Sequence, residues 1–340
     1  MDKHVAELVQ LIRSKYISTD DLSRPMDFAR KIQYLTLDVI SDIGFGEAFG
    51  NLRADADVND YIKAGEEGLL VITISMALGL TDLLQVPFIS RSLGPSEKDV
   101  TGFGRMLANA RALIDNRLKR DTEKHSDMLA SFVRHGLDAD ELLTESTLQI
   151  IAGSDTTAAA LRGIMLYLMT HPRVYSKLQS ELDAAERDGI APPSPDIIPD
   201  TAVRKLPYLQ AVVKEGIRIH PPVTDQMPKR VPKGGDTVVV DGVPVFLPGG
   251  TNIGYAAWPL HTRKDIFGPD AQEFRPERWL LEEDTARLAL MNRTHELIFG
   301  YGKYQCLGKP VALMEIGKTV FEVRTLWEFS SLSFAHPSPS

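Results

Sequence analysis

The stretch FGYGKYQCLG, residues 299–308, contains Cys306, the only cysteine in a chain of 340 residues. A lone cysteine is most often a small buried hydrophobic residue. Here it stands among Gly300, Gly302 and Gly308, and glycines allow a backbone turn to pass close to a flat ligand. The residues that follow predict a helix, whose N-terminal amides stabilise a thiolate. A thiolate at that place would be a good axial ligand for haem iron.

The composition is that of a soluble globular protein, with 43% apolar and 25% charged residues. The formal net charge is −8, and the sequence has no basic run of the kind that binds nucleic acid. We therefore expect no nucleic-acid partner. A single cysteine also excludes a framework of internal disulfides, which favours a reducing environment.

Nothing in the sequence predicts a signal peptide or a membrane anchor. The first 16 residues place apolar side chains at helical spacing instead of in one continuous block. The most apolar stretch, residues 69–80, is shorter than the roughly 18 residues needed to cross a bilayer. It predicts a buried or membrane-grazing helix. This chain, as given, is expected to be cytoplasmic or peripheral to a membrane.

Helical periodicity dominates the first two thirds of the chain, which predicts a mainly α fold. The strongest signal begins at Asp138 and Glu141, whose spacing resembles a capping box, and continues to Pro172. Valines and the pair Asp241–Gly242 later predict short strands and a hairpin. We expect one domain with four segments: helices over 1–220, short strands over 225–255, an irregular meander over 256–298 with one short helix near 282–292, and the cysteine loop with its following helix over 299–325.

The hexapeptide AGSDTT, residues 152–157, lies inside the longest predicted helix. Its glycine and threonines weaken that helix, since glycine alone costs about 1 kcal/mol relative to alanine. A tolerated polar turn is the simpler interpretation. The alternative is a functional site, because local stability is given up most often at functional sites.

The segment KEGIR places Glu215 and Arg218 on one face of a helix. Such a pair is usually a surface contact worth a few tenths of a kcal/mol. The segment FRPERW, residues 274–279, adds a further basic residue, Arg278.

These three motifs, in their order along the chain, resemble those of the cytochrome P450 family, the haem-thiolate monooxygenases. RPMDFARKIQYLTLDVISDIGFGEAFG, residues 24–50, is similar to fungal members of the pisatin demethylase group. The resemblance implies a mainly α cytochrome P450 fold with a small β-sheet region. It also implies roles for site residues. Cys306 would be the axial ligand of haem b, in a loop shaped by Phe299, Gly300, Gly302 and Gly308. Arg230 would contact a propionate, and Asp155 and Thr156 would relay protons. A buried charge network would be formed by Glu215, Arg218 and Arg278.

The resemblance further implies an enzyme that inserts one oxygen atom from O₂ into a small, largely apolar organic substrate in fungal secondary metabolism. Its electrons would come from NADPH through NADPH-cytochrome P450 reductase. The full-length family form is associated with the cytosolic face of the endoplasmic reticulum membrane. Tyr304 stands where the family usually has Arg or His, so haem retention is expected to be weaker because tyrosine donates only a neutral hydrogen bond.

Compared with the family pattern, the chain is expected to lack the front helices and strands. It is also expected to lack the closing C-terminal strands, because the residues after Val323 do not match them. An alternative hypothesis follows: the chain is a truncated, non-catalytic fragment that cannot hold haem productively.

Overall fold

The computed structural model describes residues 1–19, 21–80, 83, 86, 88–89, 94–119, 125–224, 228–280 and 284–323. The chain forms two compact units. Unit 1 consists of Met1–Ala158, Pro192–Ile198 and Lys318–Ser340, and unit 2 of Ala159–Ala191 and Pro199–Gly317. The predicted tail after residue 323 lies outside the described residues.

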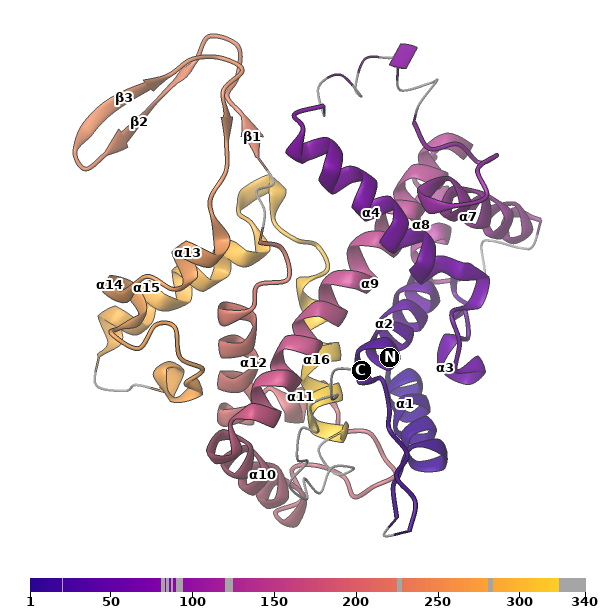
Figure 1. The fold of residues 1–340 in the computed structure, drawn as a ribbon, viewed down its shortest axis with the longest axis vertical. Helices are drawn as coiled ribbons and strands as arrows, with labels where there is room; N and C mark the ends of the chain where they lie inside the picture. The colour runs from indigo at the N-terminus through magenta and orange to yellow at the C-terminus, as the bar shows by residue number, and fades with distance from the viewer. Residues whose placement is uncertain are drawn as a thin grey trace, which may run out of the picture. The chain divides into compact units, whose positions relative to one another are not determined.

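Unit 1 is helical (Figure 1). Its described helices are α1 (Asp2–Lys15), α2 (Phe28–Phe45), α3 (Asn51–Ala54), α4 (Tyr61–Ala77), α7 (Gly102–Leu118), α8 (Met128–Arg134) and the first part of α9 (Ala139–Thr170), with a 3₁₀ turn η1 (Val58–Asp60).

Local signals set the ends of these helices. α2 begins after Asp27, whose side chain accepts a hydrogen bond from the Arg30 N–H, and it ends at Gly46, which has the left-handed conformation common after helices. α9 begins with the predicted capping box: the Asp138 N–H donates to Glu141 Oε2, and the Glu141 N–H donates to Asp138 Oδ1, each at 2.9 Å. α9 then continues unbroken to Thr170, as predicted.

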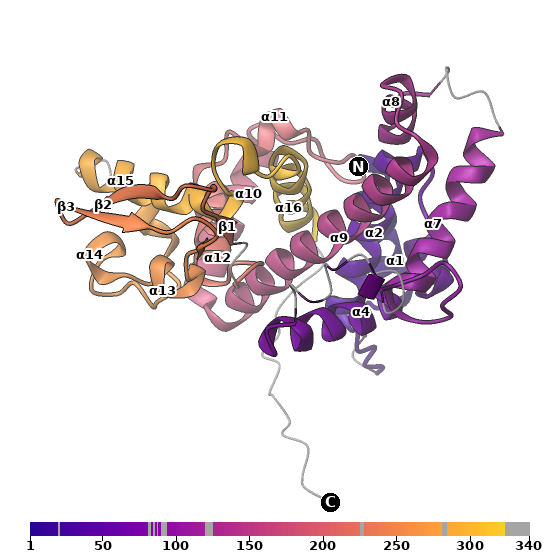
Figure 2. The same ribbon diagram turned by 90° about the horizontal axis from the view of Figure 1, so that it is seen from above.

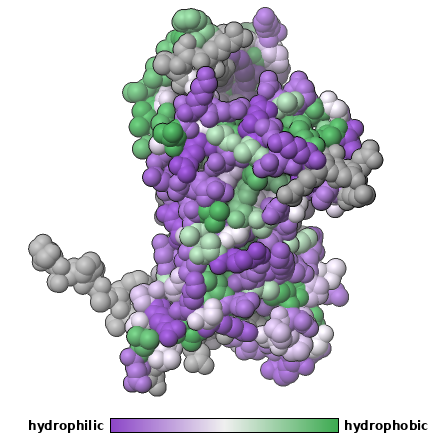
Figure 3. All heavy atoms as spheres, turned by 90° about the vertical axis from the view of Figure 1, so that its right-hand side faces the viewer, coloured by the Kyte–Doolittle hydropathy of each residue, from purple (hydrophilic) through white to green (hydrophobic). Residues whose placement is uncertain are grey.

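The second half of α4 turns apolar side chains to solvent. Leu70 and Val71 are each more than 60% exposed, and so is Leu78, the residue directly after the helix. Figure 3 shows that hydrophobic side chains gather in patches on a face that is otherwise largely hydrophilic. Among the described residues, no helix combines the length and the apolar character needed to span a bilayer.

Unit 2 contains the remaining elements (Figure 1). They are the end of α9, α10 (Pro172–Arg187), α11 (Asp200–Val203), α12 (Pro207–Ile219), β1 (Lys229–Arg230), β2 (Asp236–Val240), β3 (Val243–Leu247), β4 (Asn252–Ile253), α13 (Ala257–His261), α14 (Lys264–Phe267), η2 (Pro276–Leu280), α15 (Thr285–Glu296), η3 (Leu297–Phe299), η4 (Gly302–Tyr304) and α16 (Lys309–Val323), whose last turns belong to unit 1.

The predicted strands form two small antiparallel pairs. β2 pairs with β3 around Asp241 and Gly242, which both have positive φ as a tight hairpin turn requires. β1 pairs with β4, which brings Lys229 opposite Ile253 and Arg230 opposite Asn252. Figure 1 shows the hairpin of β2 and β3 standing away from the helices of unit 2.

The meander is more helical than the sequence predicts. Besides α15, close to the predicted short helix, it contains α13 and α14. These helices are too short to be stable alone, so packing must stabilise them. Phe267 at the end of α14 is buried in one cluster with Trp279 and Met291. α13, α14 and α15 lie close together in two perpendicular views (Figures 1 and 2).

Candidate functional site

The cysteine loop runs from the end of η3 to the start of α16 in unit 2. The Cys306 N–H donates to the Phe299 carbonyl oxygen at 2.7 Å, which closes the loop. The thiol of Cys306 is exposed, three positions before the first residue of α16. The loop therefore presents its sulfur to a group outside the polypeptide instead of burying it among side chains.

Glycine is needed in the loop for its backbone geometry. Gly300 has φ of 72° and ψ of −176°, and a Cβ atom placed on it would lie 2.6 Å from the Tyr304 carbonyl oxygen. That conformation is essentially restricted to glycine. Gly302 also has a positive φ, of 61°. At Gly308 a Cβ atom would lie 3.8 Å from the Cys306 Sγ, an ordinary van der Waals contact.

The residues of this loop fit a haem group. Haem has a flat apolar ring, an iron that accepts a thiolate and two carboxylates. The loop offers the exposed thiol, and the side chains of Leu307 and Tyr301 are 92% and 84% exposed, which leaves apolar surface for a ring to cover.

Two residues predicted to lie near haem carboxylates are placed in the same unit. Arg230, on β1, is exposed, and its Nε donates to Asn252 Oδ1 at 3.4 Å. Tyr304, on η4, is 55% exposed.

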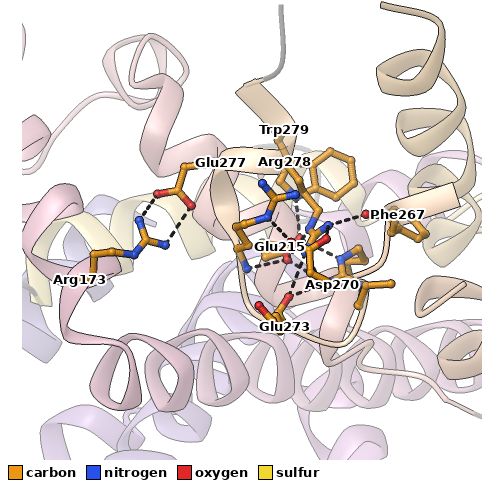
Figure 4. A network of polar contacts seen from close by, with 11 residues as sticks. Arg173, Glu215, Phe267, Asp270, Glu273, Glu277, Arg278 and Trp279 are labelled. Carbon is orange, nitrogen blue, oxygen red and sulfur yellow. Dashed lines mark hydrogen bonds and ion pairs between the residues drawn. The ribbon is translucent and has the colours of Figure 1, made fainter. Parts of the chain in front are cut away.

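The structure places Glu215, Arg218 and Arg278 in one buried cluster, with side chains that are at most 1% exposed. Figure 4 shows Glu215 beside Arg278. Glu215 Oε1 accepts hydrogen bonds from Arg218 Nη2 and Arg278 Nε, both at 2.8 Å. Glu215 Oε2 accepts a third from Arg218 Nε, also at 2.8 Å. A buried carboxylate held by two guanidinium groups in this way has its charge compensated.

The sequence did not predict the other partners in this network. The indole N–H of Trp279 donates to Glu215 Oε2, and the Arg275 N–H donates to Glu215 Oε1, both at 2.9 Å. Backbone carbonyl groups accept most of the remaining guanidinium protons. His261 and Ala271 accept from Arg218 Nη1, and Phe267 accepts from Arg278 Nη1, each at 2.6 Å. The carbonyl groups of Asp270 and Glu273 accept from the Nη2 atoms, and the Asp270 carboxylate accepts from Arg278 Nη1 at 3.2 Å. The signal that could have identified Trp279 is its place directly after Arg278 in FRPERW.

A second carboxylate lies beside this network. Partial burial alone would raise the pKa of Glu277, but hydrogen bonds from Arg173, from its own backbone and from Tyr208 outweigh it and lower the pKa to about 2. The Arg173 Nη1 lies 2.6 Å from Glu277 Oε1 (Figure 4), and the Tyr208 hydroxyl donates to the same atom at 3.0 Å. This contact joins α10 and α12 to η2.

Two buried histidines lie around the network, and the sequence did not single them out. The pKa of His295 is lowered to about 3, mainly by burial and to a smaller extent by the charge of Lys214. The pKa of His261 is lowered to about 4, mainly by burial and to a smaller extent by the charge of Arg218. Both are therefore neutral at pH 7. The ring of His295 packs at 5.3 Å from Trp279 and at 6.4 Å from Phe299, which connects the network to the cysteine loop.

Asp155 and Thr156 belong to unit 1, whereas Cys306, Arg230 and the charge network belong to unit 2. Asp155 Oδ1 accepts a hydrogen bond from Gln33 Nε2 of α2 at 2.7 Å. The Thr156 hydroxyl donates to the Ala152 carbonyl oxygen at 2.8 Å. Asp155 also lines a small cavity with apolar residues of unit 1, including Leu37, Ile62, Met106 and Ile150.

Gly153 has a packing role that the sequence did not reveal. A Cβ atom at this position would lie 2.6 Å from Ile40 Cγ1, so glycine lets α9 approach α2 closely. The helix is hydrogen-bonded through this motif and does not open there. The weak helical propensity of AGSDTT is thus explained in part by close contact between two helices.

Comparisons with known proteins agree with the motifs. The family model for cytochrome P450 matches residues 1–333. The chain is 41% identical, over 99% of its length, to the cytochrome P450 monooxygenase ABA1 of Pyricularia oryzae, and 38% identical, over 97%, to aba1 of Botryotinia fuckeliana. It spans 65% and 64% of those two proteins.

Pisatin demethylase of Fusarium vanettenii is 33% identical over 89% of this chain, which covers 57% of that protein. Among solved structures, that of a cytochrome P450 (CYP102L1) matches with a TM-score of 0.70 and 23% identity, over 95% of this chain and 66% of the other. This likeness supports the fold.

Proposed function

The chain belongs to the cytochrome P450 family, and from that premise we propose that it binds haem b through the Cys306 thiolate and acts as a monooxygenase. The observation that carries the proposal is the exposed sulfur of Cys306 in a loop that Gly300 and Gly302 turn by their positive φ angles. The haem, when bound, supplies the oxidising chemistry that inserts one oxygen atom of O₂ into an organic substrate. The family model spans both units, which supports the interpretation of residues 1–340 as one cytochrome P450 domain.

The residues of the chain have separate tasks in this proposal. Phe299, Gly300, Gly302 and Gly308 shape the loop that holds the thiolate, and Arg230 serves as a propionate partner. The network of Glu215, Arg218 and Arg278 stabilises the segment before the loop, because removing one member would leave a buried charge without its partner.

Asp155 and Thr156 are proposed to move protons in the oxygen reaction. A carboxylate and a hydroxyl on consecutive residues can pass a proton from one oxygen to the other through water. Gln33 Nε2, which donates to Asp155 Oδ1, orients that carboxylate. The Thr156 hydroxyl, which donates to a carbonyl group in the helix, keeps its lone pairs as acceptors.

Substrate and electron supply extend the proposal to the whole protein. We propose a small, largely apolar organic substrate of fungal secondary metabolism, supported by the fungal monooxygenases among the relatives. Electrons would come from NADPH through NADPH-cytochrome P450 reductase, and the full-length form would act at the endoplasmic reticulum membrane.

The test is a spectrum of the chain reconstituted with haem, reduced and exposed to carbon monoxide. A thiolate ligand shifts the Soret band in a way that no nitrogen or oxygen ligand does, and Cys306→Ala should abolish the shift. The control is Lys233→Gln, an exposed lysine outside the cysteine loop, which should keep the shift. Haem bound without the shift would refute the role of Cys306. Failure of the chain to bind haem would favour the alternative of a non-catalytic fragment.

A further inference from the structure

Tyr304 leaves the cysteine loop without a built-in cation at the position two residues before Cys306. A haem carries two propionate carboxylates, and carboxylates at the edge of a protein site are held best by charged donors. The tyrosine hydroxyl donates one neutral hydrogen bond. The structure shows where positive charge can come from instead.

Two lysines lie on the ring of Tyr304. The Nζ of Lys229 is 4.1 Å from the ring centre, and the Nζ of Lys303 is 4.9 Å from it. Lys303 is the neighbour of Tyr304 in η4, but Lys229 comes from β1, far away in sequence. Two separate segments of unit 2 therefore bring ammonium groups to one aromatic side chain.

Neither ammonium forms an ion pair with any residue that the structure describes. Other lysines near the loop are paired: Lys309 contacts Glu296, and Lys214 donates to Asn292 Oδ1 at 2.7 Å. Two positive charges close to one ring repel each other, and an anion bound between them would offset that repulsion. The ring attracts both cations by its quadrupole but leaves each able to bind a carboxylate oxygen.

The strand pairing explains why Lys229 reaches the loop. Arg230 lies opposite Asn252 in the pairing of β1 with β4 and donates to its side chain. Successive residues of a strand point to opposite faces, so Lys229 takes the face away from Asn252. Its side chain is the one that contacts Tyr304.

We propose that Lys229 and Lys303 together supply the positive charge for a haem propionate beside Tyr304, while the Tyr304 hydroxyl adds a neutral donor. The proposal rests on haem binding as proposed above. It adds two cofactor-binding residues and accounts for the replacement of the usual cation by tyrosine. Lysine suits this role because its flexible stem lets the ammonium move from the ring to a carboxylate oxygen.

The test measures the rate at which the reconstituted chain loses haem to an excess of apomyoglobin, which scavenges released haem. The variants are Lys229→Gln, Lys303→Gln and the double variant. The double variant should release haem about tenfold faster, the size expected for a charged hydrogen bond at an exposed site. The matched control is Lys233→Gln, an exposed lysine between β1 and β2, which should not change the rate.

A second arm uses haem dimethyl ester, whose propionates are uncharged. The unsubstituted chain should hold haem longer than the ester, and the double variant should lose that preference. Tyr304→Arg placed in the double variant should restore slow release. Circular dichroism at rising temperature checks that the exposed substitutions leave folding unchanged.

The outcomes separate this proposal from the proposed function. If the chain binds haem with the thiolate spectrum but the double variant keeps both the release rate and the preference for haem over its ester, the lysine proposal is wrong and the function stands. If the unsubstituted chain binds no haem, both are wrong.

Discussion

Trp279 donates its indole N–H to Glu215 Oε2 at 2.9 Å, across 64 residues of sequence. With the two arginines and the Arg275 N–H, this bond surrounds a fully buried carboxylate with donors. The same indole ring packs against His295, which in turn packs against Phe299 at the start of the cysteine loop. The charge network and the candidate ligand loop are therefore connected by continuous packing within unit 2.

Arg278→Met should lower the free energy of unfolding by about 3–5 kcal/mol, because it removes one of the two guanidinium groups that compensate the buried Glu215 and leaves the carbonyl groups of Phe267 and Asp270 without that donor, while keeping most of the side-chain volume. Urea denaturation followed by tryptophan fluorescence measures this. The matched control is Arg173→Met, which breaks a pair whose arginine is 66% exposed and should cost at most about 1 kcal/mol. Equal losses in the two variants would show that burial of the network is unimportant.

Gly300→Ala should impair the cysteine loop, because the added Cβ atom would lie 2.6 Å from the Tyr304 carbonyl oxygen and the backbone conformation is strained for alanine. The strain alone is worth about 1–3 kcal/mol. We expect weaker haem loading and a lower thermal midpoint. Gly302→Asn serves as comparison, since asparagine tolerates positive φ and a Cβ atom there meets nothing within 4 Å. A Gly300→Ala chain that loads haem as well as Gly302→Asn would contradict this account.

Acid should destabilise the protein through His295. Its pKa is about 3 in the folded state, below the ordinary value of 6.5. Below pH 6.5 the unfolded chain therefore binds a proton that the folded chain does not, so stability falls as pH falls from 6.5 to about 3 and is unaffected by this group above pH 6.5. The contribution between pH 7 and pH 5 is about 2 kcal/mol.

Two variants test the acid prediction. His295→Phe and His295→Gln both remove the titrating group, so both should show a smaller loss of unfolding free energy between pH 7 and pH 5. Only glutamine can keep the hydrogen bond to the Lys214 carbonyl oxygen, which the histidine makes at 3.2 Å. An unchanged pH dependence in both variants would exclude His295 as its source.

Gly153→Ala should destabilise unit 1 although alanine is the better helix former. The added methyl group meets Ile40 at 2.6 Å, and overpacking of this kind costs about 1–3 kcal/mol, against a gain of about 1 kcal/mol in helix propensity. Gly44→Ala is the matched control. Gly44 lies in α2, where a Cβ atom meets nothing within 4 Å, so this change should stabilise by up to about 1 kcal/mol. Chemical denaturation should give opposite signs for the two glycines, and a stabilised Gly153→Ala chain would refute the packing role.

Much of the fold could be predicted because its signals are local. The ends of α2 and α9 follow from Asp27, Gly46 and the capping box at Asp138, where partners are only a few residues apart. The hairpin follows from Asp241 and Gly242 in the same way. α13 and α14 escaped prediction because packing onto Trp279 and Met291, not their own propensity, makes them helical.

The sequence by itself determined the family, the cysteine loop and the chemical types of the candidate residues, because the spacing of glycines around Cys306 is a local property of the chain. Only the tertiary structure decided that Trp279 completes the shell around Glu215, that Gly153 meets Ile40 and that Lys229 lies on Tyr304. These contacts join residues far apart in sequence. Their formation depends on the path of the whole chain and on the free energy of packing, which no short stretch encodes.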